Sequence, residues 1–118
     1  MDKTGVVGTL ACLAQATRLE VFRLLVAAEP DGLAAGEISQ TLGVPHNTLS
    51  SHLAILTRAE LVWGERKSRS IIYRASLATL SQALMYLIKD CCRGRPEICA
   101  PLVSGLSPCC VGEETGHA

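Results

Sequence analysis

Aromatic residues are scarce in this 118-residue chain, which has one Trp, two Tyr and one Phe. Because single-stranded nucleic acid is held largely by stacking on aromatic side chains, the sequence argues against that class of ligand. The chain also lacks the apolar run of about 18 residues that a membrane-spanning helix needs. Its longest uncharged candidate, Ala75 to Ile88, is interrupted by polar residues. No membrane partner is therefore expected.

The N-terminal sequence has no basic segment followed by a long apolar core, so no secretory signal is expected. We therefore expect a cytoplasmic protein, in which thiols stay reduced. In that setting, six cysteines favour metal or metalloid chemistry over a framework of disulfides. No Cys-x-x-Cys redox motif occurs among them.

Net charge is absent overall, because 11 basic side chains balance 11 acidic ones, but the charges are segregated along the sequence. Residues 1–45 have three basic and five acidic side chains, and residues 75–118 have three and four. Residues 46–74 have five basic side chains and two acidic ones. A basic central segment can supply the sequence-independent attraction to phosphate that DNA binding needs, so a net charge of zero does not exclude it.

Hydrophobic spacing, capping residues and chain breakers predict a mainly helical domain with one β-hairpin. Four helices are expected in the first half of the chain, over residues 6–14, 18–28, 35–42 and 45–59. Thr17 and Glu20 are expected to form a capping box for the second helix, and Gly43 to end the third. Two β-prone runs, 61–66 and 69–74, then flank a short basic turn and predict the hairpin.

The fourth expected helix has two contrasting faces. Leu49, Leu53 and Leu56 share one face, whereas the opposite face has small polar residues in place of the Glu and Lys typical of a solvated helix. Such a face can approach another surface closely. Helix, turn, helix and basic hairpin follow one another in the order of a winged helix-turn-helix, whose recognition helix enters the major groove of DNA.

The residues expected to contact DNA lie in this helix and in the hairpin. Candidates for contact with bases and phosphates near the start of the helix are His46, Asn47, Thr48, Ser50 and Ser51. Candidates for contact with phosphates further along are Arg58, Arg66, Lys67 and Arg69. His52 borders the buried face and is expected to pack as a structural histidine. The alternative is a generic three-helix module whose polar face is only solvated.

Three segments resemble the ArsR/SmtB family of metalloregulatory repressors: QATRLEVFRLLV, GEISQTLGVPHNTLSSHLAILTRAELV and VWGERKSRSIIYR. The resemblance covers about residues 10–92. It implies a mainly α (α+β) winged helix-turn-helix in residues 1–92 and a homodimer paired through the N- and C-terminal helices. It also implies a repressor that binds double-stranded operator DNA with inverted half-sites and leaves it when a ligand binds. An apolar stripe from Leu77 to Cys91 on the last expected helix is compatible with such a dimer.

The ligand sites common in that family are absent from this sequence. Many arsenic-sensing members have a Cys-x-Cys motif at the positions that Ala34 and Gly36 occupy here. Zinc-sensing members have Asp and His pairs along the last helix, but no His lies in Leu77–Asp90. Ligands for a sensed metal are therefore expected elsewhere in the chain.

Three cysteines lie just after the last expected helix, and soft thiolates select soft, thiophilic ions. Cys91 and Cys92, at the helix end, and Cys99, returned by a Gly/Pro turn, can supply the three thiolates that trivalent arsenic prefers. Arg93 and Arg95 favour the reactive thiolate form. The segment CCRGRPEIC is also similar to relocated arsenic sites in some ArsR-type repressors. We therefore expect an arsenite-responsive repressor in which residues 93–118 complete the ligand site.

Other uses of the cysteines stay open. Methylated trivalent arsenicals, which need only two thiols, soft metals such as cadmium, lead and mercury, or thiol oxidation are alternative signals. Cys109 and Cys110 form a second pair and are candidate additional ligands, whereas Cys12 is expected to pack in the core. An enzyme such as a thiol-dependent arsenate reductase is disfavoured, because the sequence has no phosphate-type oxyanion loop and the winged helix accounts for most of its length.

Overall fold

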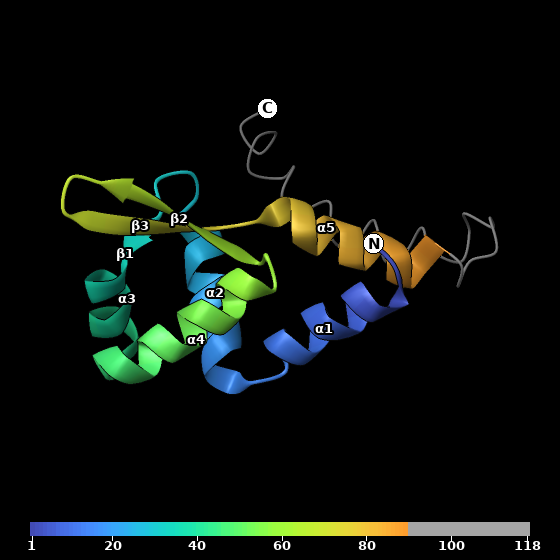
Figure 1. The fold of residues 1–118 in the computed structure, drawn as a ribbon, viewed down its shortest axis with the longest axis horizontal. Coiled ribbons are helices and arrows are strands. Elements are labelled where there is room, and N and C mark those ends of the chain that lie inside the picture. Colours follow the sequence, from blue (N-terminus) through green and yellow to red (C-terminus); the bar gives the residue numbers. More distant parts are fainter. Residues whose placement is uncertain (90–118) are drawn as a thin grey trace, which may run out of the picture. The chain divides into compact units, whose positions relative to one another are not determined.

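The computed structural model describes residues 1–89, in which five helices and three strands are found (Figure 1). They follow in the order α1 (Lys3–Leu13), α2 (Ala16–Ala27), β1 (Leu33–Ala34), α3 (Ala35–Leu42), α4 (His46–Arg58), β2 (Val62–Lys67), β3 (Ser70–Ala75) and α5 (Leu77–Lys89). Residues 1–83 form one compact unit, and a second unit begins at Leu84, partway along α5. None of the described helices is long and apolar enough to cross a membrane.

Side-chain caps explain where the first two helices begin. The carboxylate of Asp2 accepts a hydrogen bond from the backbone N–H of Gly5 at 2.9 Å and starts α1. The capping box expected at Thr17 is wrong, because α2 begins earlier. Its cap is Gln15, whose side-chain oxygen accepts the backbone N–H of Arg18 at 2.9 Å. Thr17 consequently lies inside the first turn of α2.

The helix-turn-helix consists of α3 and α4, which are joined by a tight turn. Gly43 ends α3 at φ +66°, a left-handed conformation that glycine adopts without steric cost. The hydroxyl of Ser39 donates to the carbonyl oxygen of Val44 at 2.6 Å and holds the turn together. The expected helix over residues 45–59 is confirmed with slightly shorter bounds: Pro45 is the N-cap of α4, which begins at His46 and ends at Arg58.

The expected hairpin is confirmed, but the sheet also has a third strand that the sequence pattern does not predict. Strands β2 and β3 pair antiparallel with Lys67 opposite Ser70, so the turn residues are 68 and 69 rather than 67 and 68. The short strand β1 pairs with the other edge of β3, which gives the order β1–β3–β2. Two residues are too few for an alternating pattern, so β1 emerges only from tertiary contacts.

The hydrophobic core of the first unit lies among α2, α3, α4 and the base of the hairpin. Its largest fully buried side chains are Leu25, Ile38, Leu49, Leu56, Leu61, Val21 and Val62. Cys12, at the end of α1, also packs in this core, as expected from the sequence. Burial of this apolar surface is the main contribution to stability, and it holds α4 with one face inward.

Candidate nucleic-acid interface

The two faces of α4 differ in burial as the sequence predicts. Leu49, Leu53 and Leu56 are 0%, 2% and 0% exposed and anchor the helix in the core. The side chains expected to contact DNA from this helix are all exposed, namely those of His46, Asn47, Thr48, Ser50, Ser51 and Arg58. Because most of these side chains are short, the helix can approach the edges of base pairs closely.

The basic residues near the tip of the hairpin are exposed as well. Arg66 and Lys67 end β2, and Arg69 lies in the turn. Neighbouring side chains of a strand point to opposite faces, so Arg66 and Lys67 lie on different sides of the hairpin. Positive charge on both sides of a narrow projection suits contact with a phosphate backbone rather than reading of individual bases.

Arg74, the remaining basic residue of the segment 46–74, is paired within the protein. Its Nη2 donates to Oε1 of Glu29 at 2.7 Å, and its Nε donates to Oε2 at 3.2 Å. The guanidinium also lies over the ring of Trp63, 4.9 Å from the centroid. The hydrogen bond from Arg74 lowers the pKa of Glu29, so the pair is ionised at neutral pH. The unpaired positive charge of the segment is therefore smaller than the sequence count indicates.

His52 is half-buried on α4, beside Arg18 of α2. Nη1 of Arg18 lies 3.5 Å from Nδ1 of His52, and Nε of Arg18 donates to the backbone carbonyl of Cys12 at 2.7 Å. Arg18 thereby links the end of α1 to the middle of α4. Burial raises the pKa of the Cys12 thiol, and the nearby charge of Arg18 offsets part of this effect.

A groove of about 400 Å³ lies between α4 and β3, and its lining is Ser50, Leu53, Ala54, Thr57, Arg58 and Tyr73. Ser50 and Arg58 were expected to contact DNA, but Thr57 and Tyr73 were not. Their hydroxyl groups can donate hydrogen bonds to phosphate. Helical spacing from Ala54 could have identified Thr57, whereas the position of Tyr73 beside α4 depends on how the hairpin folds back.

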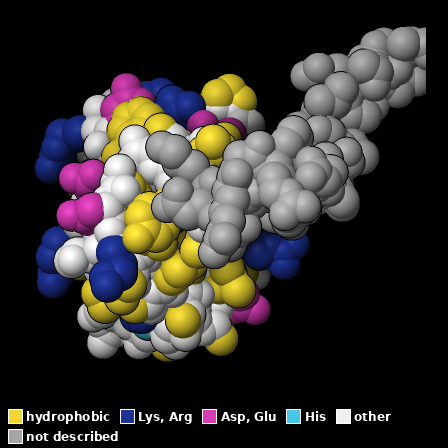
Figure 2. Space-filling model, turned by 90° about the vertical axis from the view of Figure 1, so that its right-hand side faces the viewer, with side chains coloured by type: hydrophobic (Ala, Val, Ile, Leu, Met, Phe, Trp, Pro, Cys, Tyr) yellow, Lys and Arg dark blue, Asp and Glu magenta, His cyan; other side chains and the backbone are white. Residues whose placement is uncertain are grey.

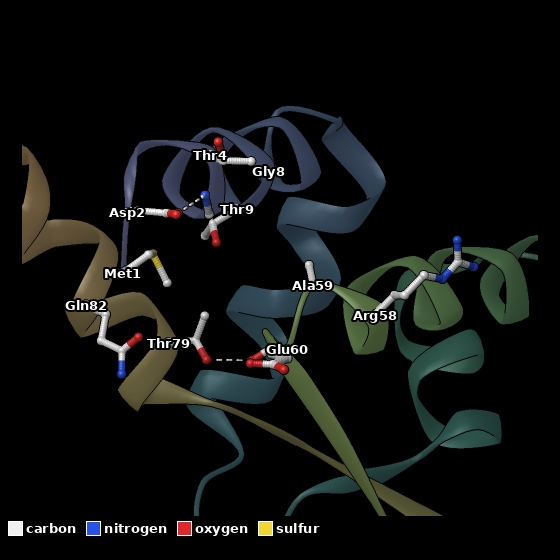
Figure 3. Close-up of a pocket in the computed structure, with 11 residues that line it drawn as sticks. Met1, Asp2, Thr4, Gly8, Thr9, Arg58, Ala59, Glu60, Thr79 and Gln82 are labelled. Carbon is white, nitrogen blue, oxygen red and sulfur yellow. Dashed lines mark hydrogen bonds between the residues drawn. The ribbon is translucent and has the colours of Figure 1, made fainter.

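A second pocket, of about 440 Å³, lies between α1, the end of α4 and the start of α5 (Figure 3). Thr79 Oγ1 donates to the carbonyl oxygen of Glu60 at 2.7 Å, which ties α5 to the end of α4. The Arg58 side chain points away from Thr79 and Glu60 in this view. Within residues 1–89, no three His, Cys, Asp or Glu side chains are grouped so that they could hold a metal ion.

The cysteines expected to bind trivalent arsenic lie outside the described residues. They are Cys91, Cys92 and Cys99, with Cys109 and Cys110 as the candidate additional ligands. The ligand site therefore stays a prediction.

Large apolar side chains are exposed on α1. Val7 and Leu10 are 59% and 42% exposed. Figure 2 shows hydrophobic side chains grouped on the face that lies at the right-hand side of Figure 1. In the second unit, Met85 and Leu87 of α5 are 55% and 41% exposed. Val7 and Leu10 are three residues apart and so share one face of α1, and an exposed apolar face of this kind is typical of contact with another protein chain.

Comparison with known proteins identifies a domain and a fold. A family model described as a helix-turn-helix domain matches residues 13–62, from the end of α1 to the start of β2. An ArsR-like transcriptional regulator from Rhodococcus sp. RHA1 is 24% identical, with a TM-score of 0.69 over 82% of this chain and 89% of that one. The transcriptional repressor BigR from Xylella fastidiosa is 28% identical, with a TM-score of 0.56 over 70% and 84%.

A third similar structure is described as the homodimeric winged helix-turn-helix DNA-binding domain of Mb0332 from Mycobacterium bovis, a possible ArsR-family regulator. It is 22% identical, with a TM-score of 0.59 over 76% of this chain and 82% of that one. A search of curated proteins found no match. The mainly α winged helix-turn-helix predicted from the sequence is thus confirmed, and the chain has the fold of ArsR-like transcriptional regulators.

Proposed function

We propose that this protein is a transcriptional repressor that binds double-stranded operator DNA as a homodimer and is released when trivalent arsenic binds its cysteines. The observation that carries the proposal is the exposed polar face of α4 beside an exposed basic hairpin. The similarity to BigR, which is described as a transcriptional repressor, supports regulation by repression.

The proposed complex divides the work between two surfaces. Asn47, Ser50 and Ser51 of α4 form hydrogen bonds with base edges in the major groove. The guanidinium of Arg58 and the basic groups of the hairpin contact phosphates, which position the protein without reading sequence.

A homodimer is supported by the exposed apolar side chains of α1 and by the similarity to a homodimeric domain. Two copies of α4 separated by about 34 Å, one turn of the double helix, match inverted half-sites in successive major grooves. A ligand that changes this separation weakens binding to both half-sites at once.

The proposed inducer site is supported by the chemistry of its donors. Cys91, Cys92 and Cys99 offer three soft thiolates within one short segment, which suits the pyramidal coordination of trivalent arsenic. Methylated arsenicals, which need only two thiols, other soft metals and thiol oxidation are the competing signals. Coupling of about 1–3 kcal/mol per site, a common allosteric magnitude, gives strong release when both protomers are loaded.

DNA binding is tested by selecting duplexes from a random pool with the purified protein. The affinity of the protein for the most enriched duplex is then measured at several salt concentrations. We expect enrichment of an inverted repeat, and affinity that falls with salt by a log–log slope of about −0.9 per phosphate contacted. Failure to enrich any duplex, with equal weak binding to all sequences, would contradict the proposal.

Arsenite is then titrated against the protein–operator complex while free thiols are counted. We expect release together with the loss of three thiols per protomer. Cys99→Ser should abolish the release of DNA by arsenite, which needs three thiols. The same variant should still release DNA with methylarsenite if two thiols are enough to bind that ligand. Cys12→Ser is the matched control, because Cys12 is buried in the core. Continued tight DNA binding with all three thiols occupied would rule out arsenic as the inducer.

A further inference from the structure

Arg74 lies on the side of the hairpin that is turned away from α4. In the antiparallel register Trp63 lies opposite Arg74, and Gly64 lies opposite Tyr73. Since side chains alternate between faces, Trp63 and Arg74 share one face and Tyr73 belongs to the other. Tyr73 lines the groove beside α4. The Arg74 side chain therefore lies on the face of the hairpin opposite the groove beside α4.

On that side, Arg74 is held by groups from two other segments. Glu29, in the turn between α2 and β1, accepts two hydrogen bonds from the guanidinium, and the two side chains are only 19% and 27% exposed. A two-bond fork between a guanidinium and a carboxylate is directional, so it fixes orientation as well as distance. The ring of Trp63 covers the guanidinium from β2.

The same turn also packs closely on the backbone of β3. Gly32 has φ +77°, and a Cβ atom there would lie 2.6 Å from the carbonyl oxygen of Tyr73 and 2.7 Å from Cγ of Arg74. The next residue, Leu33, pairs with Tyr73 across the β1–β3 ladder. Backbone pairing and the Glu29 side chain thus join the turn to β3 at adjacent residues.

Beyond Tyr73, which packs against the core at the base of the hairpin, little of the hairpin is buried. In β2 only Val62 is buried, and in β3 only Ala75, its opposite neighbour, is buried. At about 3.3 Å per residue, the tip extends roughly 13 Å beyond Trp63 and Arg74. If the hairpin tilts by about 10° at Trp63 and Arg74, its tip moves by about 2 Å. A shift of this size is enough to break a hydrogen bond between the tip and a phosphate, whose optimal length is near 2.9 Å.

We propose that Glu29, Arg74 and Trp63 form a positioning cluster that holds the hairpin where Arg66, Lys67 and Arg69 reach the DNA backbone. The inference rests on the proposed function, because it assigns Arg74 and Glu29 a part in DNA binding without contact to DNA. An acidic residue, Glu29, thereby strengthens the binding of a polyanion.

The sign of one substitution tests this role. Glu29→Gln keeps the shape of the side chain and removes a negative charge, so simple electrostatics predicts tighter binding to a random-sequence duplex. The positioning cluster predicts the opposite: severalfold weaker binding and a salt slope smaller in magnitude by about 0.9–1.8, as one or two phosphate contacts are lost. Glu20→Gln is the matched control, because it removes the same charge from an exposed position on α2, outside the cluster, and should leave binding unchanged or slightly tighter.

Arg74→Lys supplies an independent variant. It keeps the positive charge and loses the two-bond fork, so it should weaken binding and reduce the salt slope as Glu29→Gln does. Hydrogen exchange checks the mechanism: amides of β2 and β3 should exchange faster in both variants while those of α4 stay protected.

The outcomes separate the two proposals. If the wild-type protein does not bind duplex DNA, the proposed function fails and this inference fails with it. If the wild type binds but Glu29→Gln or Arg74→Lys binds equally well or better, the repressor proposal stands and the positioning cluster is overturned. Should Glu29→Gln prove unfolded in the assay, the result for Arg74→Lys decides. A variant that is only less stable would have the wild-type salt slope in its folded fraction, whereas loss of hairpin positioning lowers that slope.

Discussion

Helix α4 and the β2–β3 hairpin both belong to the proposed DNA surface, yet the protein holds them by different means. α4 buries three leucines in the core, so apolar burial sets its orientation. The hairpin fully buries one residue of each strand at its base and depends further on the half-buried Tyr73, on backbone pairing and on the Glu29–Arg74 ion pair. Cavities in the core should therefore disturb the first surface, whereas charge, salt and pH should disturb the second.

The largest effect is expected where α4 enters the core. Leu53→Ala should lower the free energy of unfolding by about 2–5 kcal/mol, because it leaves a cavity beneath the helix. Ile71→Ala, on the exposed part of the hairpin, should change it by no more than about 0.5 kcal/mol. Urea unfolding followed by circular dichroism measures both. Equal losses would show that the hairpin is as deeply anchored as α4.

The next largest effect is expected at Gly32, in the turn that packs against β3. Gly32→Ala should cost about 1–3 kcal/mol of stability, because residue 32 has a positive φ and packs against the backbone of β3. Gly36→Ala is the matched control in α3, where a Cβ meets nothing within 4 Å and alanine favours the helix, so stability should rise by up to about 1 kcal/mol. Thermal unfolding of the two variants distinguishes these opposite signs.

Substitutions in α4 and in the hairpin should differ in how far their effect on DNA affinity depends on the DNA sequence. Asn47→Ala should cost about 1–3 kcal/mol on the selected operator and little on random duplex, because a base contact is lost. Lys67→Gln should weaken binding to both duplexes alike and reduce the salt slope by about 1. Fluorescence anisotropy with the two duplexes measures each case. If Asn47→Ala instead weakened binding to both duplexes equally, Asn47 would contact phosphate rather than a base.

The smallest expected effect is the change in stability at low pH, where Glu29 becomes protonated. The Arg74 hydrogen bond lowers the pKa of Glu29 from its ordinary value of 4.5, so the pair stabilises the fold above that pH. This contribution is lost as the pH falls through the lower folded-state value. Unfolding midpoints of wild type and Glu29→Gln should differ at pH 7 and converge as Glu29 becomes protonated. The difference should be small, because solvent partly screens the pair. A constant difference down to pH 2 would contradict this account.

The sequence predicted the helix-turn-helix well because its signals are local. Gly43 ends α3 and Pro45 precedes α4, and each acts on its own turn of backbone. The error at Thr17 has a local cause too, since Gln15 occupies the cap two residues earlier. Strand β1 was missed because its two residues adopt an extended conformation only by pairing with β3.

The candidate DNA surface divides in the same way. Spacing of 3.6 residues per turn was enough to place Leu49 and Leu53 inside and Asn47 outside, because a helix repeats its geometry from residue to residue. Which arginines remain available depended on contacts between distant segments. Arg74 pairs with Glu29, 45 positions away, and no local pattern marks such a pair. Periodicity therefore identified the interface, and long-range packing determined how it is held and how much of its charge is available to DNA.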